Sequence, residues 1–267
     1  MREGLVFWVA LLCTPMLFAQ GTIDGFYRGK GSATIVLGGG YKKGTAYFAG
    51  NEKLDIDREE FYVNLFGAFG ITDRFDVQVS LPYSEIGPNQ SFQDIQFFAK
   101  YAFFQQKKHA TTLQLTAALG FSTPISNYAI GGLNDIGQQA TIVEPKVMWH
   151  YQYDSGWFAT LQAGYAFKFD EVPDALPATL KLGKASHTWY FDGYYESQYS
   201  FGGIDYRGTP RPQNFKEFAV HYHKIGGTVY KPFFRNFGIY VSASYVFSGR
   251  NIFQGPGYGF GLVYDVK

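Results

Sequence analysis

The sequence has little cysteine, little net charge and no long apolar run after its N-terminus, and each lack excludes a class of protein. A single cysteine, Cys13, occurs among 267 residues, so there is no disulfide framework. The net charge of +1 provides no basic field for nucleic acid. Beyond the first 20 residues no stretch holds 18 consecutive apolar residues, which excludes a protein that crosses a membrane with helices.

The first 19 residues have the three parts of a secretory signal peptide. Arg2 supplies the positive charge, Leu5–Leu12 form the apolar segment, and Ala19 is the small residue before a cleavage site at Gln20. The apolar segment is shorter than the ~20 residues that span a bilayer as a helix, which argues against a membrane anchor. We therefore expect two parts: a signal peptide over residues 1–19 and one mature domain over residues 20–267, without cysteine.

Aromatic residues and glycines are abundant, although the mean hydropathy is low. The chain has 27 Phe, 21 Tyr and 4 Trp, which make up 19% of its residues, together with 32 Gly. Its mean hydropathy is only −0.14. Transmembrane β-barrels combine these properties, because only every second residue of a strand faces lipid while aromatic residues gather at both membrane interfaces.

Apolar residues alternate with small or polar ones along most of the mature chain. In the C-terminal segment the apolar face consists of Tyr258, Phe260, Leu262, Tyr264 and Val266. Soluble β-sandwiches also alternate, but their strands have a mode of ~5–6 residues, shorter than the segments here. The pattern predicts an all-β fold, an antiparallel transmembrane up-and-down β-barrel of about 12 strands. The expected strands lie near 30–41, 61–71, 75–84, 94–104, 111–122, 142–153, 157–170, 178–186, 188–201, 217–231, 237–248 and 258–267.

Short and long connections alternate along the chain, which predicts its orientation. Outer-membrane barrels have short periplasmic turns and long extracellular loops, so both termini should lie in the periplasm. We expect the protein in the outer membrane of a Gram-negative bacterium, in contact with lipid and inserted by the barrel-assembly machinery. The short links are 72–74, 105–109, 154–156 and 233–236, and the long ones lie near 42–57, 123–141, 170–177 and 202–216.

One block of sequence carries a family resemblance. Residues 66–101 contain a turn over Gly70–Asp76, a strand end at Leu81–Tyr83 and a further element from Gln93 to Tyr101. This order resembles the outer-membrane family named for the MetA pathway of phenol degradation. Ser248–Asn251 resembles a late "GRN" element of the same family. The resemblance implies a barrel of about twelve strands that takes up small, often hydrophobic or aromatic, compounds.

Several charged residues fall on the face predicted to line the lumen. A charge on the lipid face would cost ~2–4 kcal/mol at the membrane midplane for Lys or Arg, so we place them inward. Two readings remain open: the charges line a polar pore and tune its selectivity, or they pair and fill a small barrel. The residues are Asp76, Lys100, Glu144, Lys146, Lys168, Asp192 and Glu196.

Two other groupings resemble reactive sites without completing one. His221 and His223 lie two apart on a strand face, but tetrahedral zinc needs three or four ligands and no third is near. Ser186 and His187 are adjacent, so they would point to opposite faces of a strand. A nucleophile elbow G-x-S-x-G does not occur. We predict no catalytic residue, metal or cofactor.

The leading hypothesis is therefore an outer-membrane channel or facilitated-diffusion protein for small, hydrophobic or aromatic, molecules. The alternative is a structural or adhesive barrel that transports nothing and acts through its extracellular loops. A membrane esterase is the third hypothesis, with the weakest support in the sequence. A lumen that holds an open path would favour the first.

Overall fold

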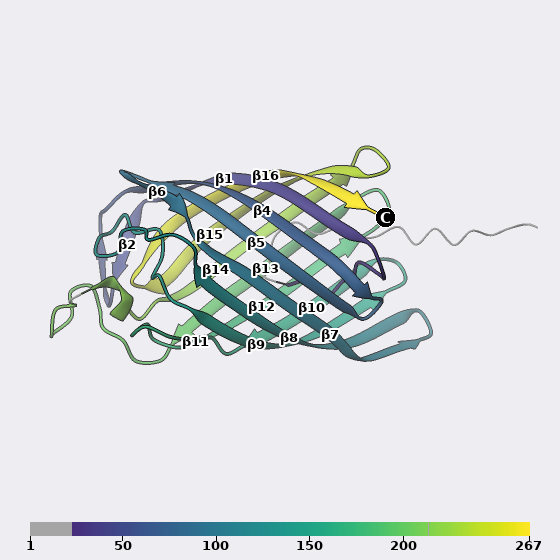
Figure 1. Cartoon of the computed structure of the whole chain (residues 1–267), viewed down its shortest axis with the longest axis horizontal. Helices are drawn as coiled ribbons and strands as arrows, with labels where there is room; N and C mark the ends of the chain where they lie inside the picture. The colour runs from purple at the N-terminus through teal and green to yellow at the C-terminus, as the bar shows by residue number, and fades with distance from the viewer. Residues whose placement is uncertain (1–22, 213) are drawn as a thin grey trace, which may run out of the picture.

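A computed structural model describes residues 23–212 and 214–267, and within them the fold is all-β apart from one 3-10 turn, η1 (Phe215–Glu217). The expected signal peptide lies outside the described residues. Twelve long antiparallel strands form a barrel (Figure 1), which confirms the predicted fold class. They are β1 (Ala33–Gly44), β4 (Arg58–Thr72), β5 (Phe75–Ile86), β7 (Asp94–Lys108), β8 (Thr111–Pro124), β9 (Ile142–Tyr153), β10 (Trp157–Gly164), β12 (Ala175–Ala185), β13 (Tyr190–Ser200), β14 (His221–Pro232), β15 (Phe237–Arg250) and β16 (Ile252–Val266).

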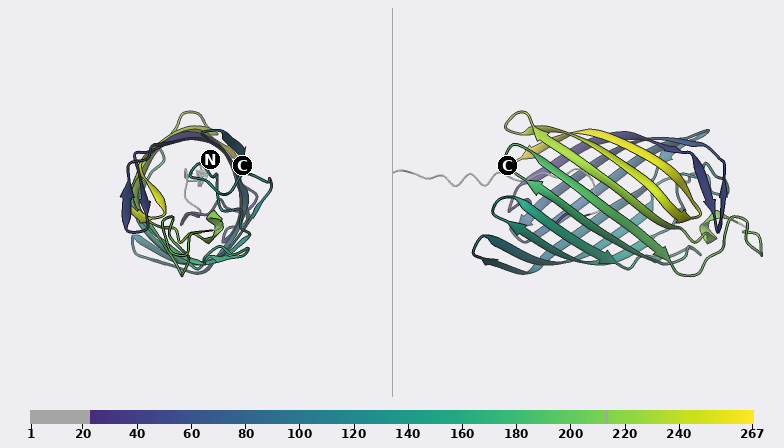
Figure 2. Two further views of the ribbon diagram at one scale, coloured as in Figure 1. Left: turned by 90° about the vertical axis from the view of Figure 1, so that its left-hand side faces the viewer. Right: turned by 180° about the vertical axis from the view of Figure 1, so that it is seen from behind.

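The first and last strands close the barrel. β1 pairs with β4 on one side and with β16 on the other, in register from Ala33 opposite Val266 to Lys42 opposite Gly257. Seen along its axis, the sheet is a complete ring (Figure 2). Closure is required in lipid, because the bilayer core offers no hydrogen-bond partner to an unpaired strand edge.

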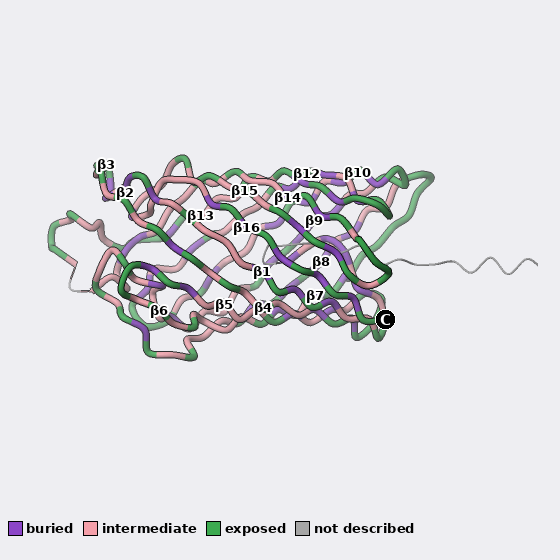
Figure 3. Tube along the Cα trace, turned by 90° about the horizontal axis from the view of Figure 1, so that it is seen from above, coloured by how far each residue is buried: buried purple, intermediate pink, exposed green. Residues whose placement is uncertain are grey.

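Side chains alternate between the outside and the lumen along each long strand. In β9, Val147 is 63% exposed whereas the next residue, Met148, is 2% exposed. Buried and exposed positions alternate in the same way around the barrel (Figure 3). The outer face carries aromatic and aliphatic side chains, which suits contact with lipid. No helix among the described residues is long and apolar enough to cross a membrane.

The two ends of the barrel differ. At one end, here the turn end, the strands are joined by short turns at 73–74, 109–110, 154–156, 186–189 and 233–236. At the other, the loop end, longer segments connect them: 45–57, 87–93, 125–141, 165–174 and 201–220. β15 and β16 are joined there by Asn251 alone. The predicted turn at 105–109 is longer than the observed one at 109–110, because β7 continues to Lys108, which pairs with Thr111 of β8.

Four short strands extend the barrel at the loop end. β2 (Ala46–Ala49) pairs with β16 and with β3 (Glu52–Leu54), while β6 (Asn89–Phe92) folds back on β5. β11 (Phe167–Lys168) pairs with β9 and continues the wall beyond the end of β10. These elements raise the rim around the mouth of the barrel.

Candidate functional site: the barrel lumen

The N-terminal segment, residues 23–32, lies inside the turn-end half of the lumen (Figure 2). Where it joins β1, the Gly31 amide donates to the carbonyl of Gly70. At its inner end Ile23 is buried against Phe98, Ala118 and Met148 from three neighbouring strands. The segment therefore fills the narrow space that the turn-end side chains leave free.

An ion-pair network fixes this segment to the wall. The Lys100 Nζ atom lies 3.0 Å from Asp24 Oδ1 and 3.7 Å from Asp76 Oδ2. Arg28 binds Asp24 through its guanidinium at 3.0 Å, and its backbone amide donates to Asp76 at 3.1 Å. Burial raises the pKa of Asp24, but Lys100 and Arg28 outweigh it, so this pKa lies well below its usual range. At neutral pH the segment is held by opposite charges.

Aromatic packing holds the middle of the segment. The Phe26 ring meets His150 and Phe158 edge-on, with centroids 4.7 and 5.1 Å apart. The Tyr190 ring stacks on that of Phe158, with centroids 5.7 Å apart. Next to Phe26, a Cβ atom on Gly25 would overlap the His150 ring, so the chain can approach the wall only with glycine there. Apolar and polar contacts together close this half of the lumen.

The other predicted lumen charges also lie on the inner side, mostly in ion pairs. Glu144 and Lys146 pair at 3.1 Å. Asp192 binds Lys181 at 3.3 Å, and Glu196 binds Lys224 at 2.9 Å. The structure thus joins Asp76 to Lys100 and Glu144 to Lys146.

Two of these partners were missed at the sequence level, and one predicted residue stays apart. Lys181 and Lys224 stand in β12 and β14, the strands on either side of β13, which carries Asp192 and Glu196. The alternation along each strand could have placed both lysines inside the barrel. The register between neighbouring strands, which brings them next to Asp192 and Glu196, cannot be read from the sequence. Lys168 is half-buried in β11, where its backbone amide donates to Asp174, and it joins none of the pairs above.

Two large cavities lie in the lumen above the N-terminal segment, and a smaller one of about 190 Å³ shares Lys42 and Lys224 with both. The central chamber, about 400 Å³, has Asp24 in its lining together with side chains of β4, β5, β10, β12 and β13. The vestibule, about 450 Å³, lies nearer the loop end. Lys42, Glu60 and Lys224 line both, so the two cavities adjoin at these residues. Together they reach from the barrel mouth to the inner end of the segment.

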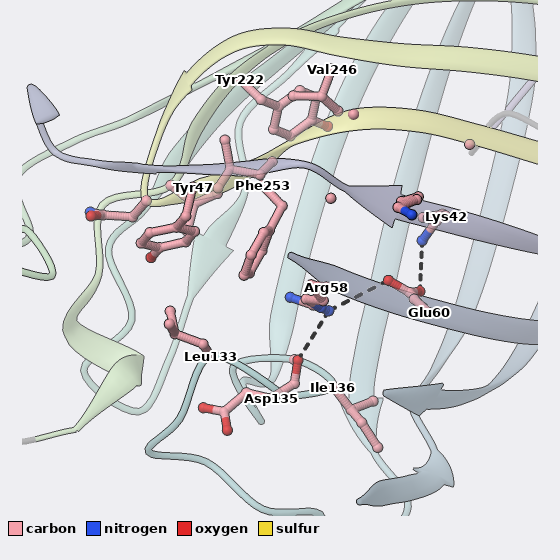
Figure 4. Close-up of a pocket in the computed structure, with 18 of the residues that line it drawn as sticks. Lys42, Tyr47, Arg58, Glu60, Leu133, Asp135, Ile136, Tyr222, Val246 and Phe253 are labelled. Carbon is pink, nitrogen blue, oxygen red and sulfur yellow. Dashed lines mark hydrogen bonds and ion pairs between the residues drawn. The ribbon is translucent and has the colours of Figure 1, made fainter. Parts of the chain in front are cut away.

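The vestibule joins aromatic and aliphatic walls to one cluster of charges (Figure 4). Arg58 binds Glu60 at 3.5 Å and the Asp135 carbonyl at 3.4 Å, while Lys42 binds Glu60 at 2.7 Å. The Arg58 guanidinium also lies over the Phe253 ring, 5.0 Å from its centroid. The apolar and aromatic lining comprises Tyr47, Leu133, Ile136, Phe215, Phe218, Val220, Tyr222, Val246, Ile252, Phe253 and Pro256.

The loops around the vestibule are anchored by the turn that resembles the family's late motif. The Asn251 amide donates to the carbonyls of Ile204 and Ala219 and accepts from the Tyr206 amide. Arg250 beside it pairs with Asp205. Nothing in the sequence alone indicates this role for Arg250 and Asn251. They bind loop 201–220 to the turn between β15 and β16 at residues 204–206 and at Ala219.

The two histidines and the Ser186–His187 pair lie outside the lumen and form no reactive site with the described residues. His223 faces outward, where its Nδ1 atom lies 2.6 Å from the Tyr195 hydroxyl, and the His221 ring lies 4.5 Å from that of Tyr199. Of the two expected positions, in the lumen or at the loop end, the pair occupies the second, at the start of β14. Ser186 occupies a turn and donates to the Trp189 carbonyl. Among the described residues no group of three or more His, Cys, Asp or Glu could hold a metal ion.

Comparison with known proteins decides the family. The family described as "Putative MetA-pathway of phenol degradation" matches residues 29–262. The chain belongs to this family. Its fold resembles that of an outer membrane channel from Pseudomonas putida F1, which is 13% identical, with a TM-score of 0.72 over 91% of this chain and 99% of the other. The NanC porin is 12% identical, with a TM-score of 0.54 over 86% of this chain and 98% of that one. No curated protein sequence matches the chain.

Proposed function

We propose that this protein is an outer-membrane channel or facilitated-diffusion protein for small molecules. The observation that carries the proposal is the adjoining pair of cavities, which leads from the loop end to the N-terminal segment. A barrel that served only as a scaffold would have no need of a hollow loop-end half, since small barrels can fill their interiors with side chains. The solved channels with a similar fold support the same function.

The lining favours uncharged solutes, including hydrophobic and aromatic ones. Aromatic and aliphatic side chains dominate the vestibule walls, so an apolar ring can leave water there. The charges that border the path are already paired, as Lys42 is with Glu60 and Lys224 with Glu196. A paired charge attracts an ionic solute less than a bare one does. The path therefore selects by polarity and size more than by charge.

The proposal places the protein in the outer membrane after removal of residues 1–19, with the loop end outside the cell. Its partners are then outer-membrane lipid, the solute and the barrel-assembly machinery. No catalytic step is assigned, because the Ser186 hydroxyl is bound within its own turn and His187 follows it there. In this proposal the lumen carries the function, which is the passage of solute.

Reconstitution tests the channel function directly. Purified protein in a planar lipid bilayer should give discrete current steps, and liposomes that contain it should swell in isotonic solutions of small uncharged solutes. Protein-free liposomes and liposomes with heat-unfolded protein are the controls. A sealed bilayer without swelling would contradict the proposal and favour a barrel that acts through its loops.

A further inference from the structure

The central chamber is polar but balanced in charge. Its lining includes three lysines and three carboxylates, Lys42, Lys181, Lys224, Asp24, Glu60 and Glu196. Each of them has a partner of opposite charge within 3.3 Å, either in the chamber or, for Lys181 and Asp24, in the adjacent wall. An ionic ligand would find no unpaired counter-charge among these groups. The hydrogen-bonding capacity left in the chamber must come from neutral side chains.

Some of those neutral side chains are buried and without a partner. Both amide atoms of Gln78, the Oε1 atom of Gln162 and the Ser84 hydroxyl make no hydrogen bond to any described residue. All three residues line the chamber, with side chains from 1% to 6% exposed. A buried polar atom without a partner costs ~1–3 kcal/mol, so the fold alone does not account for these groups. Each of these atoms has less than 1 Å² of its surface exposed, so a bound molecule gains them as donors and acceptors when the side chains turn toward the chamber.

The unpartnered groups come from well-separated parts of the wall. Gln78 stands in β5 and Gln162 in β10, with β7, β8 and β9 between them in the sheet. A carboxamide offers two donors and an acceptor, and a hydroxyl group can satisfy either kind. A single hydroxyl group cannot bond to Gln78 and Gln162 at the same time, so a molecule that bonds to both needs several hydroxyl groups. Tyr62 and Tyr194 add aromatic faces to the lining.

We propose that the central chamber binds an uncharged, multiply hydroxylated small molecule, a sugar or polyol. Its volume of about 400 Å³ lies within the usual range of small-molecule sites. The assignment deepens the proposed function, on which it rests for the path by which the solute arrives. It narrows the solute from any small molecule that passes the vestibule to one that carries several hydroxyl groups.

Isothermal titration of the detergent-solubilised mature protein with D-glucose tests the site without any need for transport. D-glucuronate, D-glucosamine and benzyl alcohol are matched probes that add a negative charge, add a positive charge or remove all but one hydroxyl. We expect D-glucose to bind and each of the other three to bind at least about tenfold more weakly, the equivalent of ~1.4 kcal/mol. Equal binding of benzyl alcohol or of either ion overturns the proposal.

Two substitutions that conserve volume locate the site. Gln78→Met and Gln162→Met remove the amides and keep the side-chain length, so each should weaken glucose binding at least about fivefold. Gln106→Met is the control, because Gln106 is exposed at the turn end of β7. The urea midpoint of unfolding should not fall in the lumen variants, since the amide atoms named here have no partner to lose. Unchanged binding in both lumen variants overturns the assignment.

Current measurements on the same proteins separate this proposal from the channel function. Conductance without glucose binding in the wild type would leave the channel and refute the site. Glucose binding without conductance would keep the site and refute the channel. A reduction of current by D-glucose that Gln78→Met abolishes would support both.

Discussion

The turn-end and loop-end halves of the lumen differ in how they are filled, although the same twelve strands enclose both. In the turn-end half, residues 23–32 lie within the ring, with Ile23 and Phe26 packed against the wall and Lys100 holding Asp24. In the loop-end half the inner side chains leave two adjoining cavities. One half is filled by a piece of chain and the other is hollow.

The difference shows how alternation can specify a barrel wall without specifying a pore. Inward positions in both halves combine polar and small residues with large aromatic ones, and both halves contain ion pairs. What closes the turn-end half is a segment outside the strands, whose carbonyls and carboxylate complete the coordination of Lys100. The filling of the turn-end half is therefore set by residues that the strand pattern does not include.

Replacement of residues 23–29 by a Gly/Ser linker of equal length should have the largest effect. The linker removes Asp24, Phe26 and Arg28 from the lumen, so the turn-end half should become as hollow as the loop-end half. We expect single-channel conductance to rise several-fold in planar bilayers. The same replacement over residues 51–57 of the first loop, which are exposed except for the half-buried Leu54 and Ile56, is the control. An unchanged conductance would show that this segment does not limit the path.

Lys100→Met should have the next largest effect, because it breaks the contacts that join the segment to the wall. It leaves Asp76 and Asp24 without their shared ammonium, and removal of one partner from a buried pair costs ~3–5 kcal/mol. We expect a lower free energy of unfolding in urea and partial recovery in the double variant Lys100→Met, Asp76→Asn. Lys107→Met, which removes an exposed pair with Asp154, should change little. If Lys100→Met and Lys107→Met lowered the free energy of unfolding equally, the segment would not be held by its bond to Lys100.

Lys224→Gln should alter ion selectivity in the open half. It leaves Glu196 bound to the Tyr222 hydroxyl but without its cation, so the path gains one uncompensated negative charge. The reversal potential in a salt gradient should move toward cation selectivity, with conductance almost unchanged. Lys231→Gln lies on the same strand but faces outward, and should produce no shift. A shift in both variants would mean that surface charge, and not the lumen, sets selectivity.

Acidification should produce the smallest effect. The pKa of Asp24 is lower in the folded protein than its usual value of 3.8, so its stabilisation is complete at neutral pH and lost as pH falls below that value. The ionisable groups around it are Lys100, Arg28, Asp76 and His150, together with the phenols of Tyr27 and Tyr190. We expect constant conductance from pH 7 to about 4.5 and more frequent openings below about 3.5. Asp24→Asn should remove that transition, and its persistence would assign it to another group.

Much of the wall could be predicted from the sequence. The alternation along 258–266 located the lipid face because one row of side chains must meet hydrocarbon and the other must not. Asp76 and Lys100 could be placed inward for the same reason. Their common partner Asp24 could not, because residues 23–32 have no alternation to show where they lie. Lys181 and Lys224 were missed because a cross-strand pair depends on register, and a shift of one residue reverses every face.

By itself the sequence determined the class of fold, the membrane it suits and the face each strand residue presents, since a lipid solvent permits a single pattern of polarity. The tertiary structure alone decided what the lumen contains. Closure of β1 on β16 creates an interior, and only there do Asp24, Gln78 and Gln162 come to share one chamber. The physical reason is that period-two alternation constrains each strand separately, whereas a cavity depends on distances between strands far apart in the sequence.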